Sequence, residues 1–209
     1  MKRLLLFIIL IALSSSTYAQ PKIYLIRHAE VEIENQGWSS AKKAQKYKLD
    51  YNNADIKQFD PRLVLDKIDK SEAIDTIFCS PQSRALQTAE MLFDPSVFIK
   101  IDNNLRELDY QVTQIPILRL PVKAWLTVSR ISWMIGSKIT PKSKYKQRKD
   151  DLELVVDEII AYAETHGKSV VVAHGMLNRE LIKILKEKGW NLEHNDGLGN
   201  LSVNYLTKL

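Results

Sequence analysis

Four short segments of this chain carry residues that could act on a phosphate group. They are Arg27-His28-Ala29-Glu30, Ser80-Pro81-Gln82-Ser83-Arg84-Ala85-Leu86-Gln87-Thr88-Ala89, Leu105-Arg106-Glu107-Leu108 and Val172-Ala173-His174-Gly175. A guanidinium group binds phosphate oxygens, a neutral imidazole can attack phosphorus, and a carboxyl group can protonate the leaving group. The residues that would supply these functions are Arg27, Arg84, His28, His174 and Glu107. The set indicates phosphoryl chemistry if the fold brings the segments together.

Three of the four segments directly follow apolar runs that are typical of buried strands. These runs are residues 23–26, 76–79 and 169–173. The carboxyl ends of parallel strands meet at one edge of an open α/β sheet, and such folds place their ligands at that edge. We therefore expect the two arginines, the two histidines and the glutamate to converge in one site.

Strand-like and helix-like patterns alternate along most of the chain. Strands are expected at 22–27, 75–79, near 97–101 and at 169–173, and helices at 39–50, 61–69, 83–93, 150–165 and 178–188. The tail from Leu201 to Leu206 alternates like an edge strand. This order predicts an α/β fold with a mostly parallel central sheet and helices on both faces.

The first 19 residues have the three parts of a secretory signal peptide. Lys2 and Arg3 form a basic start, residues 4–13 are an unbroken apolar run, and residues 14–19 are small or polar. The apolar run is about half of the roughly 20 residues that span a bilayer, which favours a cleaved signal over an uncleaved anchor. We therefore expect cleavage after Ala19, a single catalytic domain at 20–209, and a periplasmic or secreted protein.

Charge and cysteine content narrow the function only slightly. The net charge is +5, and it falls to +3 when Lys2 and Arg3 are removed (5 − 2), so nucleic-acid binding is not expected. The single cysteine, Cys79, cannot form an intrachain disulfide. Its place at the end of an apolar strand predicts a small buried side chain and not a nucleophile.

The segment 111–149 departs from the alternating pattern. It is apolar up to Met134 and then carries a basic run of Lys138, Lys142, Lys144, Lys146, Arg148 and Lys149. One interpretation is a helical cap that buries its apolar residues on the sheet and exposes its lysines. The other is a substrate lid whose stretch Lys138–Lys149 selects large anionic phosphoesters or contacts an anionic membrane surface.

In this order, the four segments resemble the motifs of the histidine phosphatase superfamily, which has a phosphoglycerate mutase-like fold. The first segment is closer to the Arg-His-Gly-Glu of the mutase-like branch than to the Arg-His-Gly-x-Arg-x-Pro of acid phosphatases and phytases. The resemblance implies that His28 is the nucleophile and becomes phosphorylated. It implies that Arg27, Arg84 and His174 bind the phosphoryl oxygens, with His174 also counted as catalytic. Glu107 would be the general acid, with Asp109 as the alternative, and no metal or other cofactor would be required.

Two positions depart from the family pattern. Ala29 stands where the family usually has glycine, and Glu34 stands where it often has asparagine, with Asn35 one residue later. A glutamate near the pocket would repel a phosphate, so the specificity of the site is less clear than its chemistry.

These features predict an exported phosphomonoesterase that hydrolyses a small-molecule or lipid-linked phosphate ester through a phosphohistidine on His28. One alternative is a phosphoglycerate mutase-type phosphoryl transferase, and another is a catalytically silent phosphate-binding module. Export argues against the mutase, because its sugar-phosphate substrates are cytoplasmic. The complete set of arginines and histidines argues against the silent module.

Overall fold

The computed structural model describes residues 20–34, 36–70, 73–108, 110–135 and 142–208, without the side chains of 134 and 142–145. The proposed signal peptide at 1–19 lies outside these residues. In the described part of the chain, no helix is both long enough and apolar enough to cross a bilayer.

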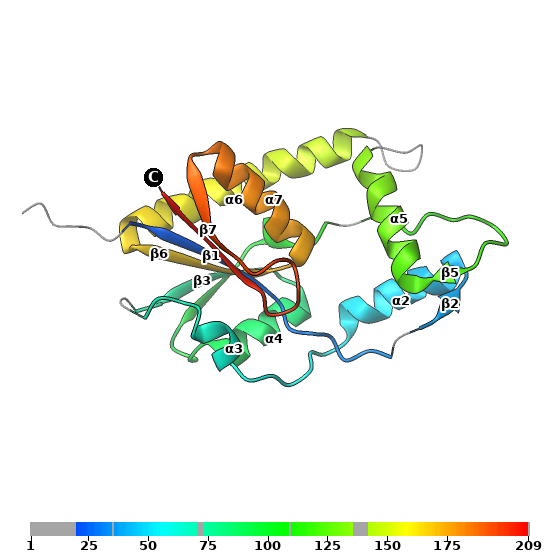
Figure 1. Cartoon of the computed structure of the whole chain (residues 1–209), viewed down its shortest axis with the longest axis horizontal. Helices are drawn as coiled ribbons and strands as arrows, with labels where there is room; N and C mark the ends of the chain where they lie inside the picture. Colours follow the sequence, from blue (N-terminus) through cyan, green and yellow to red (C-terminus); the bar gives the residue numbers. More distant parts are fainter. Residues whose placement is uncertain (1–19, 35, 71–72, 109, 136–141, 209) are drawn as a thin grey trace, which may run out of the picture.

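A six-stranded sheet forms the centre of the molecule (Figure 1), in the order β4-β3-β6-β1-β8-β7. The strands are β1 (Lys22–Arg27), β3 (Thr76–Cys79), β4 (Phe98–Ile101), β6 (Lys168–Ala173), β7 (Trp190–Asn195) and β8 (Val203–Lys208). The pairs β4–β3, β3–β6 and β6–β1 are parallel, while β8 runs antiparallel to both of its neighbours. The predicted fold class, an α/β fold with a mostly parallel sheet, is confirmed.

Helices cover both faces of this sheet. Side chains along a strand alternate between its faces, so both faces carry apolar residues that a layer of helices buries. The helices are α3 (Arg62–Leu65) and α4 (Ser83–Leu92) on one face, and α6 (Lys142–His166) and α7 (Gly175–Glu187) on the other. Ile23 and Leu25 of β1 pack in the core beneath α6 and α7, and Tyr24 and Ile26 pack in the core with α4. A short 3-10 helix, η1 (Asn103–Leu105), follows β4.

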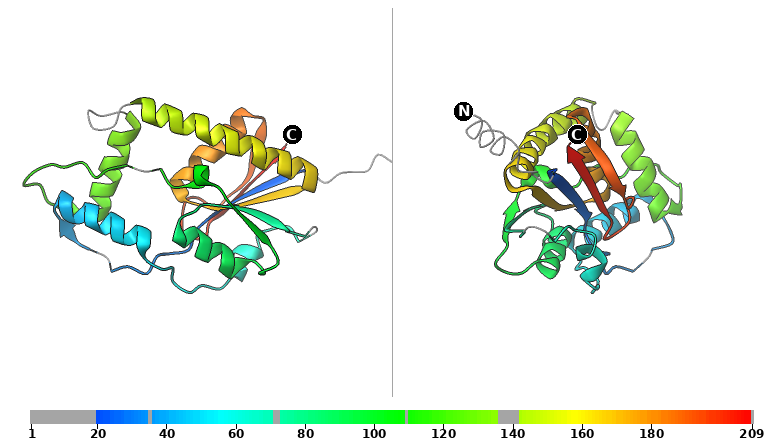
Figure 2. Two further views of the ribbon diagram at one scale, coloured as in Figure 1. Left: turned by 180° about the vertical axis from the view of Figure 1, so that it is seen from behind. Right: turned by 60° about the vertical axis from the view of Figure 1, so that its left-hand side comes forward.

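A second structural unit lies beyond the carboxyl ends of the parallel strands, and we call it the cap (residues 36–53 and 110–135). It contains α2 (Ala41–Asn53), α5 (Val122–Ile135) and a small ribbon of β2 (Trp38–Ser39) with β5 (Leu120–Pro121). Figures 1 and 2 show α2 and α5 side by side at the end of the molecule away from the first strand's start. The buried Trp125 holds the unit together, since its indole N–H donates to the carbonyl of Ser39 at 2.8 Å.

Two features of the fold differ from the sequence predictions. The tail is not an edge strand: β8 lies inside the sheet, and the edge is β7, which was not predicted. The segment Trp190–Asn195 is rich in polar residues and only partly buried, so it gives little strand signal. The helical part of 111–149 is confirmed as α5, but its first turns pack on α2 and not on the sheet.

Candidate active site

A cavity of about 440 Å³ lies between the carboxyl edge of the sheet and the cap. It is lined by Arg27, His28, Gln45, Tyr47, Lys48, Leu49, Tyr51, Asn52, Gln82, Arg84, Arg106, Glu107, Leu108, Tyr110, Gln111, Lys123, Leu126 and Arg130. Four of the five predicted site residues therefore line one cavity. The fifth, His174, stands directly behind His28, with 5.1 Å between the ring centroids. The predicted convergence at the strand ends is confirmed.

His28 follows β1 and is held in one tautomer. Its backbone N–H donates to the carbonyl of Ala173 at 3.0 Å, so the main chain is fixed to the end of β6. The ring Nδ1 lies 2.6 Å from the carbonyl of Ala29 and must donate to it, which leaves a lone pair on Nε2. Burial first, and then the positive charges of Arg84 and Arg27, lower the pKa of His28 to about 3. The imidazole is therefore neutral and carries its free lone pair on Nε2.

Arg84 lies buried in the first turn of α4 and faces this lone pair. Its Nε donates to Nε2 of His28 at 3.2 Å. The other guanidinium nitrogens donate to Oδ1 of Asn52 at 3.0 Å and to Oε1 of Gln82 at 3.3 Å. The guanidinium also lies over the ring of Tyr51, 5.2 Å from its centroid. Arg84 thus joins His28 to side chains from the cap.

The rest of the α4 motif fixes the loop that carries His28. The hydroxyl of Thr88 accepts from the N–H of Ala29 at 2.9 Å and donates to the carbonyl of Arg84 at 2.6 Å. Gln87 accepts from the N–H of Ile56 at 3.0 Å and so holds the chain that returns from the cap. These contacts explain why threonine and glutamine stand at these positions of the helix.

Arg27 and Gly175 depend on each other. The guanidinium of Arg27 donates through Nη1 to the carbonyl of Leu198, and its Nε is buried without a partner. A Cβ atom on Gly175 would lie 3.2 Å from Cδ of Arg27 and 3.2 Å from the same carbonyl. A larger residue here would crowd both the arginine and the carbonyl that it binds, which favours glycine after His174.

His174 is oriented by Ser80. Nε2 of the ring lies 2.7 Å from the serine Oγ, and that oxygen also accepts from the N–H of Gln82 at 3.3 Å. In the tautomer in which this hydroxyl donates to Nε2, the ring proton sits on Nδ1, and that nitrogen is buried without a partner. Burial and the charge of Arg84 hold the pKa of His174 well below its usual range. The neutral ring offers one N–H donor beside His28.

Glu107 is half-buried in the wall of the cavity. Its backbone N–H donates to Oε1 of Gln82 at 2.9 Å, and its carboxylate accepts from the N–H of Leu108 at 3.0 Å. Burial raises the pKa of this carboxyl group, while Arg130, the Leu108 N–H and Arg84 oppose the rise. A carboxyl group with a raised pKa is suited to donate a proton. The alternative acid, Asp109, lies outside the described residues.

Sequence reasoning missed Gln82, which connects two of the motifs. Its Oε1 accepts both from Arg84 and from the backbone of Glu107. A glutamine between Ser80 and Arg84 gives no signal of this role, because the contact forms only in the folded chain. The cap residues Tyr51, Asn52 and Arg130 were missed for the same reason.

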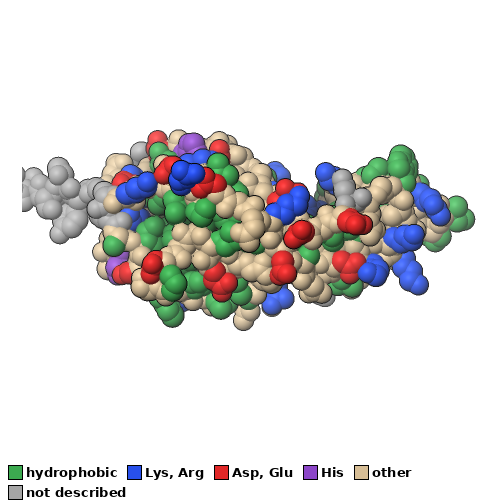
Figure 3. Space-filling model, turned by 90° about the horizontal axis from the view of Figure 1, so that it is seen from below, with side chains coloured by type: hydrophobic (Ala, Val, Ile, Leu, Met, Phe, Trp, Pro, Cys, Tyr) green, Lys and Arg blue, Asp and Glu red, His purple; other side chains and the backbone are tan. Residues whose placement is uncertain are grey.

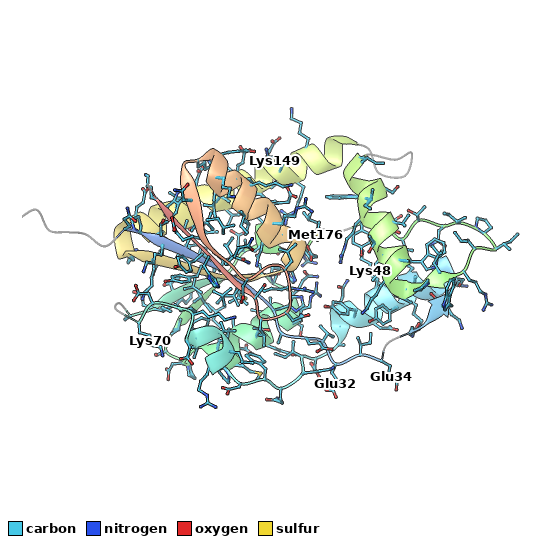
Figure 4. All side chains as sticks on the ribbon, viewed as in Figure 1. Glu32, Glu34, Lys48, Lys70, Lys149 and Met176 are labelled. Carbon is cyan, nitrogen blue, oxygen red and sulfur yellow. The ribbon has the colours of Figure 1, made fainter. Side chains whose placement is uncertain are left out.

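Several residues singled out in the sequence lie away from the cavity. Glu34 is exposed and points outward in Figure 4, so it does not oppose a phosphate in the site. Asn35 is outside the described residues. Cys79 is fully buried, and burial raises the pKa of its thiol to about 12, which confirms the prediction of a structural cysteine. His166 stacks on Tyr162 and likewise takes no part in the cavity.

The basic run 138–149 does not line the cavity in the part that the structure describes. Arg148 donates to the carbonyls of Asn104 at 2.6 Å and Arg106 at 2.7 Å, and Lys149 pairs with Glu187 at 3.3 Å. Figure 4 shows Lys149 on the far side of α6. The cations that reach the cavity from the segment 111–149 are Lys123 and Arg130 of α5. The idea that Lys138–Lys149 overhangs the pocket is therefore wrong for its described members.

No cluster of three or more His, Cys, Asp or Glu side chains that could hold a metal ion occurs among the described residues. Positive charge at the site comes from arginine and lysine side chains.

The sequence matches the family described as histidine phosphatase superfamily (branch 1) over residues 23–208. The chain belongs to this family. The family and the enzyme class inferred from the four motifs are thereby confirmed, and the protein is a phosphatase of this superfamily. No curated protein sequence matches the chain at a significant level.

Solved structures share the fold at low sequence identity. The ecdysone phosphate phosphatase of Bombix mori in complex with tungstate superimposes with a TM-score of 0.55 and 12% identity, covering 89% of this chain and 88% of that one. The phosphoserine phosphatase of Entamoeba histolytica in complex with 3-phosphoglyceric acid gives 0.51 and 17%, covering 88% and 89%. A mycobacterial glucosyl-3-phosphoglycerate phosphatase with VO3 gives 0.50 and 18%, covering 88% and 92%.

Proposed function

We propose that this protein is an exported phosphomonoesterase that works through a phosphohistidine on His28. The observation that carries the proposal is the state of His28. Its Nδ1–H donates to the carbonyl of Ala29, and its Nε2 lone pair accepts a hydrogen bond from Arg84 at the base of the cavity. A neutral imidazole beside two arginines is suited to attack the phosphorus of a bound ester.

In the first step, Nε2 of His28 attacks phosphorus and the bond from phosphorus to the ester oxygen breaks. Arg27, Arg84 and the Nδ1–H of His174 would bind the phosphoryl oxygens, and two of these three residues hold buried nitrogens that lack a protein partner. Such donors stabilise the charge that spreads over the oxygens in the transition state. Glu107 would give its proton to the departing oxygen.

In the second step, water attacks the phosphohistidine. The carboxylate of Glu107 now takes a proton from that water, the bond between nitrogen and phosphorus breaks, and inorganic phosphate leaves. His28 returns to its neutral form and Glu107 to its protonated form, so each turnover consumes one water. Arginine side chains carry the electrostatic role that a metal ion has in other phosphatases, so the reaction is proposed to be metal-independent.

The walls of the cavity favour a particular class of leaving group. Beyond the base, the cap adds three cations, Lys48, Lys123 and Arg130. The rings of Tyr47, Tyr51 and Tyr110 line the same region. We propose an ester whose leaving group carries a second negative charge next to an apolar or planar part, either a small molecule or a lipid-linked phosphate.

Hydrolysis of para-nitrophenyl phosphate in the presence of EDTA tests the reaction. We expect steady turnover by the parent chain, and His28→Ala should abolish both turnover and the trapped phosphoenzyme. The matched control is His166→Ala, which removes an exposed histidine outside the cavity and should leave activity unchanged. The trapped phosphate should be acid-labile and base-stable.

The same assay separates the alternatives. A mutase would show little hydrolysis without its own substrate, and a silent module would show none. Acid-stable labelling, or labelling that persists in His28→Ala, would overturn the assignment of the nucleophile. A panel including phosphoserine and 3-phosphoglycerate would then rank leaving groups by kcat/KM.

The proposal that this protein is exported rests on the pattern of the first 19 residues alone. When the full chain is produced in a bacterial host, we expect the protein in the periplasm with Gln20 at its amino terminus. Protein that stays in the membrane fraction with Met1 retained would indicate an uncleaved anchor, and protein in the cytoplasm would refute export.

A further inference from the structure

The outer end of the cap exposes a group of large apolar side chains. Trp38, Ile115, Ile117 and Leu118 are 70%, 42%, 102% and 40% exposed. In the view from below (Figure 3), hydrophobic side chains gather at the end of the molecule opposite the grey N-terminal segment, with Lys and Arg around them. Soluble proteins seldom leave such a group uncovered without a binding role.

The fold brings these four residues together from two segments. Trp38 pairs with Pro121 and Ser39 with Leu120 in the β2–β5 ribbon, and the loop that contains Ile115, Ile117 and Leu118 ends at Leu120 of this ribbon. Both ribbon views show this loop as the outermost part of the cap. Trp38 and the three loop residues are therefore carried by the same ribbon at the outer end of the cap.

The tip is held in a strained turn. The N–H of Leu118 donates to the carbonyl of Pro116 at 2.8 Å, and the residue between them, Ile117, has a φ of 67°. This is the rarer form of γ-turn, which a β-branched residue strongly disfavours. The chain thus keeps an isoleucine fully in solvent at a conformational cost, and such outliers cluster where a segment binds something.

The charge of the cap indicates what it binds. Residues 36–53 and 110–135 contain seven Lys and Arg and one acid, Asp50, which pairs with Lys46 at 2.6 Å. Three of the cations, Lys42, Lys43 and Arg119, are exposed and neighbour the apolar tip in sequence. A second copy of this chain would meet the same positive charge and be repelled. An anionic surface would be attracted.

We propose that this distal surface, Trp38, Ile115, Ile117 and Leu118 with Lys42, Lys43 and Arg119, binds anionic phospholipid bilayers. Short apolar side chains that enter the headgroup region, a tryptophan at the interface and a rim of cations are the features by which proteins lie on membranes without spanning them. Each cation near an anionic leaflet strengthens partitioning by roughly fivefold. The proposal does not depend on the catalytic assignments.

The fluorescence of Trp38 can report on the contact between this surface and a bilayer. Of its four tryptophans, Trp38 is exposed, and Trp125, Trp133 and Trp190 are buried at 0%, 7% and 2% exposure. Acrylamide quenching and a shift in emission therefore report on the distal surface. With the full chain and vesicles of phosphatidylglycerol, we expect a blue shift, protection from acrylamide and quenching by brominated lipid. Phosphatidylcholine vesicles should give much weaker effects, and salt should reduce the binding.

The test variant is the triple substitution Ile117→Ser, Leu118→Ser and Arg119→Ser. It should lower partitioning onto phosphatidylglycerol at least about tenfold and remove the Trp38 shift. The matched control is Leu63→Ser with Leu154→Ser, two leucines that are 57% and 69% exposed on α3 and α6. It should bind as the parent does. The N-terminal apolar run, whether retained or removed, is the same in every variant, so it cannot account for a difference between them.

Three results would overturn the proposal. Trp38 could stay equally open to acrylamide with and without vesicles, or the triple variant could bind like the parent. Protection of Trp38 that rises with protein concentration in the absence of lipid would instead show that a second copy covers the surface. Activity on para-nitrophenyl phosphate in solution should be the same in all variants, so this outcome is independent of the phosphatase assay.

Discussion

The base of the cavity and its mouth are built in different ways. At the base, His28, Arg84 and His174 sit at the ends of strands or in the first turn of a helix, and each is buried and tied by hydrogen bonds. At the mouth, Lys123 is exposed and Arg130 is half-buried on α5, a helix that belongs to the cap. The sheet therefore fixes the atoms that react, while a separate unit provides the groups that meet the rest of the substrate.

This difference indicates how chemistry and specificity are divided. Displacing a group at the base changes the transition state, so we expect losses in kcat. Changing a group at the mouth alters binding that is similar in the ground state and the transition state, so we expect losses in KM. Variants on each side can test whether the division holds.

After the complete loss expected for His28→Ala, the largest effect is expected for Glu107→Gln, because it removes the proposed proton donor without changing the shape of the side chain. Esters with poor leaving groups should lose about 10² to 10⁴-fold in kcat/KM, and para-nitrophenyl phosphate far less, since its leaving group departs as a stabilised anion. Paired measurements on an alkyl and an aryl phosphate provide the check. Equal losses on both would make Glu107 a binding residue, and Asp109→Asn would be the next variant.

The dependence of activity on pH also tests the proposed role of Glu107 as the proton donor. His28 must be neutral to attack, and its pKa is about 3, so activity should fall only at strongly acidic pH. Glu107 must be protonated, and burial raises its pKa, so activity should fall again as the pH rises through that value. We expect a bell-shaped pH profile for poor leaving groups, and loss of its upper limb in Glu107→Gln. An upper limb that survives the substitution belongs to another group.

A medium effect is expected at the mouth, where Arg130→Gln and Lys123→Gln form a matched pair. Both should raise KM about tenfold for esters with an anionic leaving group, since one charge contact is lost. Of these two cations, Arg130 and not Lys123 affects the pKa of Glu107, and it opposes the rise that burial causes. Arg130→Gln should therefore also move the upper pH limb to higher pH, and Lys123→Gln should not. If both shift the limb, or neither does, the mouth and base are not divided as described.

The same division explains which parts could be predicted from sequence. His28, Arg84 and His174 follow apolar strands in recognisable motifs, so strand position alone brings them together. Gln82 could not be found this way, because its two partners come from α4 and from the loop after η1.

The cap was only partly predictable. Its apolar residues showed that a helix is present, but α5 packs against α2, which is about 80 residues earlier in the chain. The position of Arg130 over the cavity depends on that long-range contact. Likewise, the alternating pattern of the tail predicted a strand but could not show that β7 would cover its edge.

The smallest effect is expected for Arg148, a member of the basic run 138–149 that contacts the segment before Glu107. Arg148 lies on α6, yet its guanidinium donates to the carbonyl of Asn104, within the 3-10 helix that leads to Glu107, and to the carbonyl of Arg106, just after it. Losing these two bonds should loosen the acid without touching the substrate. Arg148→Gln should therefore lower kcat a few-fold, up to about tenfold, on esters with poor leaving groups and leave KM unchanged.

The neighbouring Lys149→Ser is the control for that variant. Lys149 pairs with Glu187 at 3.3 Å on the surface, where an ion pair contributes at most about 1 kcal/mol and often nothing measurable. Its kinetics and melting temperature should match those of the parent. A rise in KM for anionic esters in either variant would show that this run does reach the substrate. A drop in kcat confined to Arg148→Gln would instead show that α6 acts on catalysis by holding the Glu107 loop, and that the charge of the run has no part in it.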